Sequence, residues 1–196
     1  MKKGLLVVIA LIAVFAIWAV SARNNLVTQE EGVKEKWSQV ENVYQRRLDL
    51  IPNLVNTVKG YAAHEKETLE GVVEARAKAT QISGDALKNV INDPQAFQKF
   101  QESQSGLSSA LSKLMVVVEK YPDLKANQNF LQLQSQLEGT ENRIAVERMR
   151  YNEAAKEFNV SVRRFPAALV ASIFGFKEKA YFQADAAASK APEVKF

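Results

Sequence analysis

The chain of 196 residues contains no cysteine and a single histidine, His64. The lack of cysteine excludes disulfides, thiol nucleophiles and cysteine-bound metals. One histidine cannot supply, within one chain, a histidine-based zinc site, a Ser-His-Asp triad with a spare base or a paired Glu-x-x-His di-iron site. We interpret His64 as a solvated turn residue, and we expect no enzymatic activity, no cofactor and no metal.

Glycine and proline are also scarce, with 8 and 5 residues, whereas hydrophobic residues make up 47% of the chain. Few helix breakers and an ample apolar fraction indicate long helices in one all-α domain with accessory segments. The net charge is +4, and setting aside Lys2 and Lys3 leaves 24 basic against 22 acidic side chains, or +2. Because these charges are interspersed along helical faces and form no basic stripe, nucleic-acid binding is not expected.

The strongest apolar run lies near the N-terminus, where residues 4–20 carry no charge. At about 1.5 Å per residue, a helix over residues 4–22 just crosses a hydrocarbon core of roughly 30 Å. Residues 19–22 also offer the small side chains of a cleavage site, so a cleaved signal peptide is the alternative. The length of the run and the helical pattern that resumes after Arg23 favour an uncleaved transmembrane anchor. The positive charge of residues 1–3 predicts that this end is cytoplasmic and that the rest lies outside.

The remainder carries apolar residues at alternating spacings of three and four, which is the heptad stripe of packed helices. The spacing predicts four helices, over residues 24–61, 63–82, 94–121 and 124–165. The first stripe has two polar interruptions, Glu30 and Arg47, and it continues across Pro52, which indicates a kink and not a helix end. Short breaks favour an antiparallel up-down-up-down four-helix bundle over residues 23–166, with long first and fourth helices.

Several polar residues interrupt these stripes. If the chain folds back near Ala62 and near Asp123, they fall at the same level along the bundle axis. They are Arg47, Arg76, Gln104, Glu141 and Glu147. We predict one buried polar layer in which Arg47 and Arg76 pair with Glu141 or Glu147, and Gln104 completes the hydrogen bonding. Such layers usually fix helix register at a cost in stability, so a structural role is the main interpretation and a ligand site is the alternative.

The C-terminal segment 167–182 concentrates apolar and basic side chains. The candidates for contact with a membrane surface are Leu169, Ile173, Phe174, Phe176, Lys177 and Lys179. Antiparallel packing would bring this segment beside the anchor, where an amphipathic segment can lie among lipid headgroups. The alternative is that the segment closes the open base of the bundle. Residues 183–196 are rich in alanine, lysine and proline and are expected to be disordered.

Several motifs occur in order along nearly the whole chain. They are Trp37, residues 44–55 (YQRRLDLIPNLV), 59–61 with 64–65, 75–77, 121–127 (YPDLKAN), 138–145 (EGTENRIA), 148–152 (RMRYN), 165–166 and 174–176. Together they resemble the LemA family of bacterial membrane proteins. The resemblance implies a short N-terminal segment, one membrane helix and a four-helix bundle, and it supplies no established reaction.

These observations predict a single-pass protein of the bacterial cytoplasmic (inner) membrane, with its bundle on the outer or periplasmic side. The main functional prediction is a scaffold or adaptor that acts through unidentified protein partners and touches membrane lipid, with self-association left open. The alternative is a small-ligand sensor that uses the buried Arg/Glu layer. A ligand-sized pocket at Arg47, Arg76 and Glu147 would favour sensing, and a filled, fully paired layer would favour a scaffold.

Overall fold

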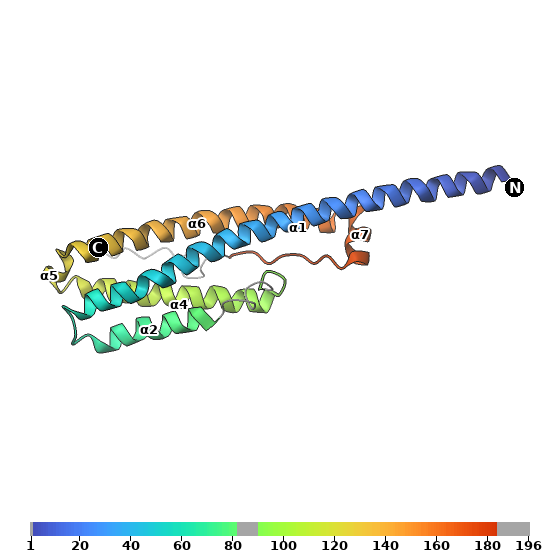
Figure 1. Ribbon diagram of the computed structural model, residues 1–196. Coiled ribbons are helices and arrows are strands. Elements are labelled where there is room, and N and C mark those ends of the chain that lie inside the picture. Colours follow the sequence, from blue (N-terminus) through green and yellow to red (C-terminus); the bar gives the residue numbers. More distant parts are fainter. Residues whose placement is uncertain (1, 82–89, 184–196) are drawn as a thin grey trace, which may run out of the picture.

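The computed structural model describes residues 2–81 and 90–183, without the side chain of Lys2. Within these ranges the chain forms six helices and no strand, which confirms the all-α prediction (Figure 1). The helices are α1 (Lys2–Lys59), α2 (Lys66–Gln81), α4 (Pro94–Val118), α5 (Pro122–Lys125), α6 (Gln128–Arg163) and α7 (Ala167–Phe174). The expected end of the second helix at residue 82 and the expected tail from residue 184 onward lie outside the described residues.

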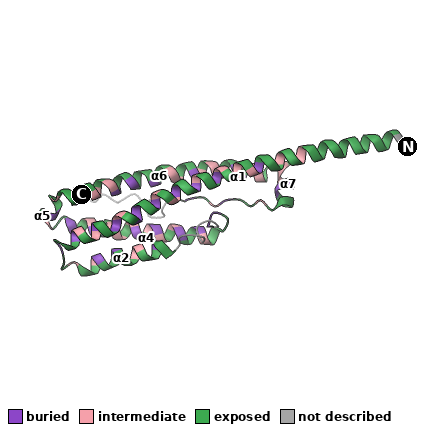
Figure 2. Cartoon of the chain, in the orientation of Figure 1, coloured by how far each residue is buried: buried purple, intermediate pink, exposed green. Residues whose placement is uncertain are grey.

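The N-terminal third of α1 extends away from the rest of the molecule (Figures 1 and 2). Its large apolar side chains between Leu5 and Val20 are mostly more than half exposed, with Ile17 at 72%. In the described part of the chain, α1 is the one helix that is apolar and long enough to cross a membrane. Such a surface is unfavourable in water and favourable in lipid. Beyond it, α1 continues as one helix through Pro52 to Lys59.

The remaining two thirds of α1 pack along α6, and α2 packs along α4 and more briefly on α1. The heptad stripe accounts for this arrangement, because side chains three and four residues apart share one helical face. The buried apolar residues of α1 are Leu26, Val33, Trp37, Val40, Tyr44, Leu48, Ile51, Leu54 and Val58. They contribute to two hydrophobic clusters, one beside the apolar third of α1 and one at the far end of the helices.

The helix ends follow local chemistry. The side chain of Asp93 accepts hydrogen bonds from two backbone amides of the first turn of α4, and Pro94 takes the first helical position, where no N–H is needed. The predicted end of this helix at residue 121 is wrong, because α4 stops at Val118 and Pro122 begins the separate short helix α5. Asn127 then caps α6 through the amide of Phe130.

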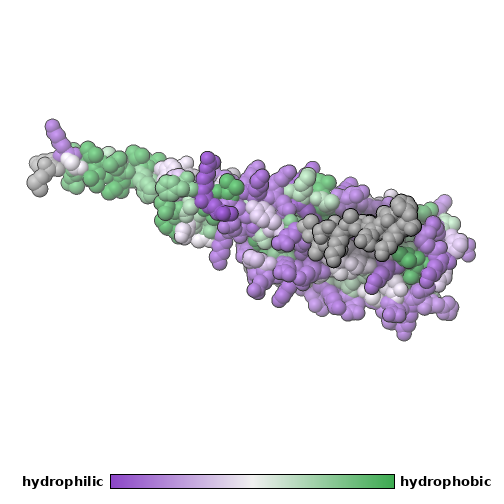
Figure 3. All heavy atoms as spheres, turned by 180° about the vertical axis from the view of Figure 1, so that it is seen from behind, coloured by the Kyte–Doolittle hydropathy of each residue, from purple (hydrophilic) through white to green (hydrophobic). Residues whose placement is uncertain are grey.

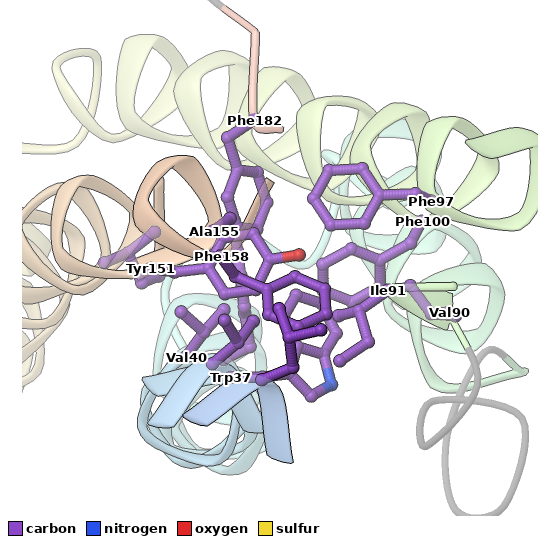
Figure 4. Packing of buried hydrophobic residues seen from close by; sticks show 14 of the residues in the cluster. Trp37, Val40, Val90, Ile91, Phe97, Phe100, Tyr151, Ala155, Phe158 and Phe182 are labelled. Atoms are coloured by element: carbon purple, nitrogen blue, oxygen red, sulfur yellow. The ribbon is translucent and has the colours of Figure 1, made fainter. Parts of the chain in front are cut away.

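An aromatic cluster around Trp37 fills part of the hydrophobic core of the body (Figure 4). The ring of Trp37 lies 5.8 Å from Phe97, 5.4 Å from Phe100, 5.4 Å from Tyr151 and 6.0 Å from Phe182, measured between centroids. These separations are typical of stabilising aromatic pairs. Phe182 comes from the C-terminal segment, so this segment completes the core.

Candidate functional site

The side chain of Arg47 lies at the centre of a polar contact that joins α1, α4 and α6. It is 2% exposed. Its Nη1 lies 2.9 Å from a carboxylate oxygen of Glu141 and 3.0 Å from the hydroxyl of Ser108, and its Nη2 donates to the side-chain oxygen of Gln104. Its Nε is buried without a partner among the described residues. Charged hydrogen bonds of this kind fix the register of packed helices, that is, their relative position along the helix axes.

Arg76 does not join this contact, contrary to the prediction that it pairs with a glutamate. Its Nε donates instead to the backbone carbonyl oxygen of Leu48, at 2.9 Å. In a regular helix this carbonyl would accept from the amide of residue 52, and Pro52 has no amide hydrogen. The guanidinium therefore satisfies an acceptor that Pro52 leaves free inside α1, and α2 is joined to α1 at this point.

Glu147 also lies outside the contact at Arg47. Its carboxylate pairs with Arg150 on the same helix, at 2.8 Å, and its side chain is 15% exposed. An arginine three residues further along a helix lies on the same helical face, within reach of this carboxylate. The observed polar contact thus contains Arg47, Gln104 and Glu141 of the predicted set, with Ser108 in addition.

A groove of about 310 Å³ opens beside Arg47. It lies between α4 and α6 and is lined on its polar side by Arg47, Ser108, Ser112, Gln134, Glu138 and Glu141 and on its apolar side by Leu111, Met115 and Leu137. Its volume is at the lower limit of small-molecule sites. The guanidinium at its floor already has three partners, so an anionic ligand would have to compete with the Glu141 carboxylate.

A second candidate surface lies where the apolar third of α1 meets the body. Helix α7 buries Val170 and Ala171 in the core cluster that the half-buried Trp18 and Ala22 of α1 also contact. Hydrophobic atoms continue from the N-terminal helix onto this end of the body (Figure 3). The surface therefore extends an apolar region that already suits lipid.

The outer side of α7 is apolar and exposed. Ile173 is 78% exposed, Phe174 53% and Leu169 50%, and Phe165 just before α7 is 77% exposed. The guanidinium of Arg23 lies 5.1 Å from the centre of the Phe174 ring. Large apolar side chains gathered in this way commonly mark a membrane or protein contact.

Two members of the predicted membrane-surface set are not free at the surface. Lys179 is buried, so its prediction is wrong, and Phe176 is only partly exposed. Lys179 is 3% exposed, and its Nζ lies 2.6 Å from Glu30 and 2.6 Å from the side-chain oxygen of Asn92. Phe176 is half-buried with its ring 6.3 Å from that of Phe158. Lys177 is exposed. The reason is that α7 ends at Phe174, so Phe176, Lys177 and Lys179 lie beyond the helix and do not share its exposed face.

Residues 176–183, here called the C-terminal strap, contain neither helix nor strand. The strap runs from α7 along the gap between α4 and α6 (Figure 1). The hydroxyl of Tyr151 donates to the carbonyl of Ala180 at 2.9 Å. Burial raises the pKa of this phenol well above its ordinary value near 10. The neutral, donating form is therefore maintained at physiological pH.

No group of three or more histidine, aspartate or glutamate side chains is placed to hold a metal within the described ranges. His64 is exposed in the turn between α1 and α2. The geometry of the described residues thus offers a packing contact at Arg47, an apolar surface at α7 and a seated strap.

The helical body, the lipid-compatible third of α1 and the apolar surface of α7 define an all-helical, membrane-associated protein. The family is shown by comparison with known proteins. Residues 36–196 match the LemA family, and the chain belongs to that family.

Its relatives include Magnetosome proteins MamQ 1 and MamQ 2 of Paramagnetospirillum magneticum (strain AMB-1). Each is 30% identical over 194 residues, which cover 91% of this chain and 71% of the relative. Protein LemA of Metamycoplasma hominis is 27% identical over 173 residues, which cover 88% of this chain and 74% of the relative.

The sequence did not predict the site on α1, α4 and α6 that binds the strap, although one residue pointed to it. Glu30 interrupts the apolar stripe of α1, and the sequence alone predicts no partner for it. A carboxylate on a buried stripe needs a cation or hydrogen-bond donors. That cation is Lys179, which lies on a segment with no periodicity.

Proposed function

We propose that this chain is a membrane-anchored helical scaffold or adaptor that acts through protein partners and catalyses no reaction. The observation that carries the proposal is the continuity of α1, which runs unbroken from its exposed apolar third into the core of the body. A continuous helix transmits position and orientation, because bending it requires breaking backbone hydrogen bonds. The body would thus be held at a fixed distance from the bilayer.

Helix α7 supports this proposal as a second point of attachment. A lone transmembrane helix is free to rotate and tilt, and interfacial side chains restrict both. Ile173 and Phe174 would enter the headgroup region beside the end of the membrane segment. The exposed basic side chains of Arg163, Arg164 and Lys177 would face anionic lipid headgroups.

The proposal includes a location and an arrangement. Lys2 and Lys3 favour a cytoplasmic N-terminus in a bacterial cytoplasmic membrane, with the body on the outer side. We infer that α1, α2, α4 and α6 form an antiparallel four-helix bundle, since α1 packs on α6 and α2 packs on α4. Two relatives are named for the magnetosome and not for a reaction, which agrees with a structural role.

Small-ligand sensing is the second candidate function, and the groove beside Arg47 is the observation in its favour. The Arg47 guanidinium is already bound to Glu141, Gln104 and Ser108. A ligand would gain little from a charge that is already compensated. We therefore prefer the scaffold.

Photo-crosslinking in native membranes tests the adaptor role. A photoreactive residue is placed at Val116, which is 68% exposed on α4, and at Val73, which is 53% exposed on α2. The buried Val40 is the control position. Scaffolding predicts one dominant protein partner captured from one exposed position and not from Val40. Adducts only with lipid and with the chain itself would contradict the adaptor role.

Single-cysteine labelling tests the attachment through α7, and the lack of native cysteine makes the label unique. A fluorophore on Ile173→Cys should be quenched by brominated lipid in vesicles that contain anionic phosphatidylglycerol. The matched control is Lys120→Cys, which is exposed at the far end of the body. Equal quenching at the two positions would refute the proposed seat.

A further inference from the structure

The C-terminal strap is held mainly through its backbone. The side chain of Asn159 donates to the carbonyl of Lys179 at 2.9 Å and accepts from the amide of the same residue at 2.7 Å. Asn152 pairs in the same way with Phe182, at 3.0 and 2.9 Å. These amides lie seven residues, or two turns, apart on one face of α6.

A third amide acts from the opposite helix. Gln101 of α4 donates to the carbonyl of Gln183 at 2.9 Å and accepts from its amide at 3.3 Å. The Nη2 of Arg148 donates to the same carbonyl at 3.0 Å. Side-chain amides thus replace the neighbouring strand that an extended backbone normally needs. Recognition of this kind supplies affinity without regard to the side chains of the bound segment.

Two pockets add selectivity for particular side chains. The first takes the ammonium of Lys179 between Glu30 and Asn92, 5.1 Å from the centre of the Phe158 ring. The second takes the ring of Phe182, 4.8 Å from Phe97, within the aromatic cluster (Figure 4). The seat therefore selects an extended segment with a lysine and, three residues later, an aromatic ring.

The gap between α4 and α6 continues beyond the strap. Ser108 lies two turns beyond Gln101 on α4, and Glu141 lies two turns from Arg148 on α6, which is about 10.5 Å along each helix. There the two helices line the groove beside Arg47, which is not filled by any described residue. The glutamates at this end favour a basic side chain.

We propose that the face between α4 and α6 is a binding groove for an extended peptide of a partner protein, and that the strap is its built-in occupant. The partner segment carries a lysine and, three residues later, an aromatic residue, and it takes the place of the strap. None of the contacts to the strap requires that it belong to the same chain. The groove beside Arg47 gives a longer segment a first contact before the strap leaves.

The inference goes beyond the proposed scaffold by naming the chemistry of its partner. The strap has a strong advantage in competition, because its tether gives it an effective concentration in the millimolar range. Binding in trans should therefore be weak in the unaltered chain and strong when the two anchors of the strap are removed.

The test uses the full chain in detergent micelles and a fluorescent peptide with the sequence of residues 176–183, FKEKAYFQ. Peptide affinity is measured by anisotropy for the unaltered chain and for the double variant Lys179→Ala with Phe182→Ala. We expect the variant to bind the peptide at least about tenfold more tightly. The matched control is Lys177→Ala with Tyr181→Ala, which alters two exposed strap residues and should gain no affinity.

Three further measurements make the result decisive. Adding Asn152→Ala to the double variant should lower peptide affinity at least about tenfold, and so should alanine in place of the second lysine of the peptide. In the unaltered chain, millimolar peptide should speed hydrogen exchange at the amides of Lys179 and Phe182, so the test does not depend on the folding of the variant.

Peptide binding that ignores Asn152 and the lysine would overturn the inference, and so would unchanged hydrogen exchange in the unaltered chain. In that case the strap is only a closing segment of the core. The crosslinking and lipid-quenching tests of the scaffold would keep their meaning, because they do not involve the strap.

Discussion

The contact between Arg76 and the Leu48 carbonyl leads to a quantitative prediction about Pro52. If the guanidinium replaces the amide that Pro52 lacks, its value depends on proline at that position. A hydrogen bond from a charged donor contributes about 1.5–3 kcal/mol to the free energy of unfolding. We therefore expect Arg76→Met to lower that free energy by about 2 kcal/mol in the unaltered chain.

The same substitution should matter less when residue 52 can donate. In Pro52→Ala the new amide lies one helical turn after Leu48 and can bond to its carbonyl. Arg76→Met should then lower the free energy of unfolding by less than about 1 kcal/mol, which gives a coupling energy of about 1–2 kcal/mol between the two sites.

The assay is guanidinium-induced unfolding of the full chain in detergent micelles, followed by far-ultraviolet circular dichroism. The control is Arg143→Met, which removes an exposed arginine from α6. Its effect should be small and the same with proline or alanine at position 52. The reasoning is refuted if Arg76→Met has the same effect in both backgrounds, or no larger an effect than Arg143→Met.

Three further predictions concern stability. Glu141→Ala removes the carboxylate, itself 54% exposed, from the buried Arg47 guanidinium, so it should lower the free energy of unfolding by about 2 kcal/mol. Arg47→Met with Gln104→Leu should lower it less, and the reverse order in chemical unfolding would be contrary evidence. The raised pKa of Tyr151 means that its contribution is complete below pH 10 and declines as pH rises above that value. Tyr151→Phe should flatten this alkaline fall in Tm, and an unaltered fall would show that other groups cause it. Gly175 has φ +74°, so Gly175→Ala should cost about 1 kcal/mol in thermal unfolding, and no loss would indicate that the turn relaxes.

The helical parts of the fold could be predicted from the sequence, because the buried residues of an amphipathic helix recur every three or four positions. The stripe through Trp37 and Val40 predicted the inward face of α1, and Asp93 with Pro94 predicted the start of α4. The same spacing placed Arg47 within one turn of Glu141 and of Glu147, and Arg47 lies 2.9 Å from Glu141.

The partner of Arg76 could not be obtained from spacing alone. Height along a bundle predicts which residues are level, but it does not say which helices are neighbours. Helix α2 packs on α4 and α1, so the carbonyl of Leu48 was within reach and the carboxylate of Glu147 was not. An acceptor freed by Pro52 is a backbone feature, and a comparison restricted to charged side chains overlooks it.

The strap was hidden for a related reason. An extended segment bound through its backbone leaves no periodic pattern, and Lys179 follows exposed residues that suit a membrane surface. The information lay in the receiving helices, where Asn152 and Asn159 repeat at two turns on α6. Side-chain amides that repeat along one helical face do not identify a binding site until the structure shows a backbone segment opposite them.

The two polar interruptions of the α1 stripe, Glu30 and Arg47, each bind a side chain of opposite charge from another segment. Glu30 binds the lysine of the strap, and Arg47 lies at the floor of the groove that no residue in the described ranges fills. They are 17 residues apart, which corresponds to about 25 Å along the helix. A stripe required only for packing would be more stable with apolar residues at both positions. The charge of Glu30 is explained by the lysine of the extended strap that it binds, and the charge of Arg47 is explained by its contact with Glu141, Gln104 and Ser108.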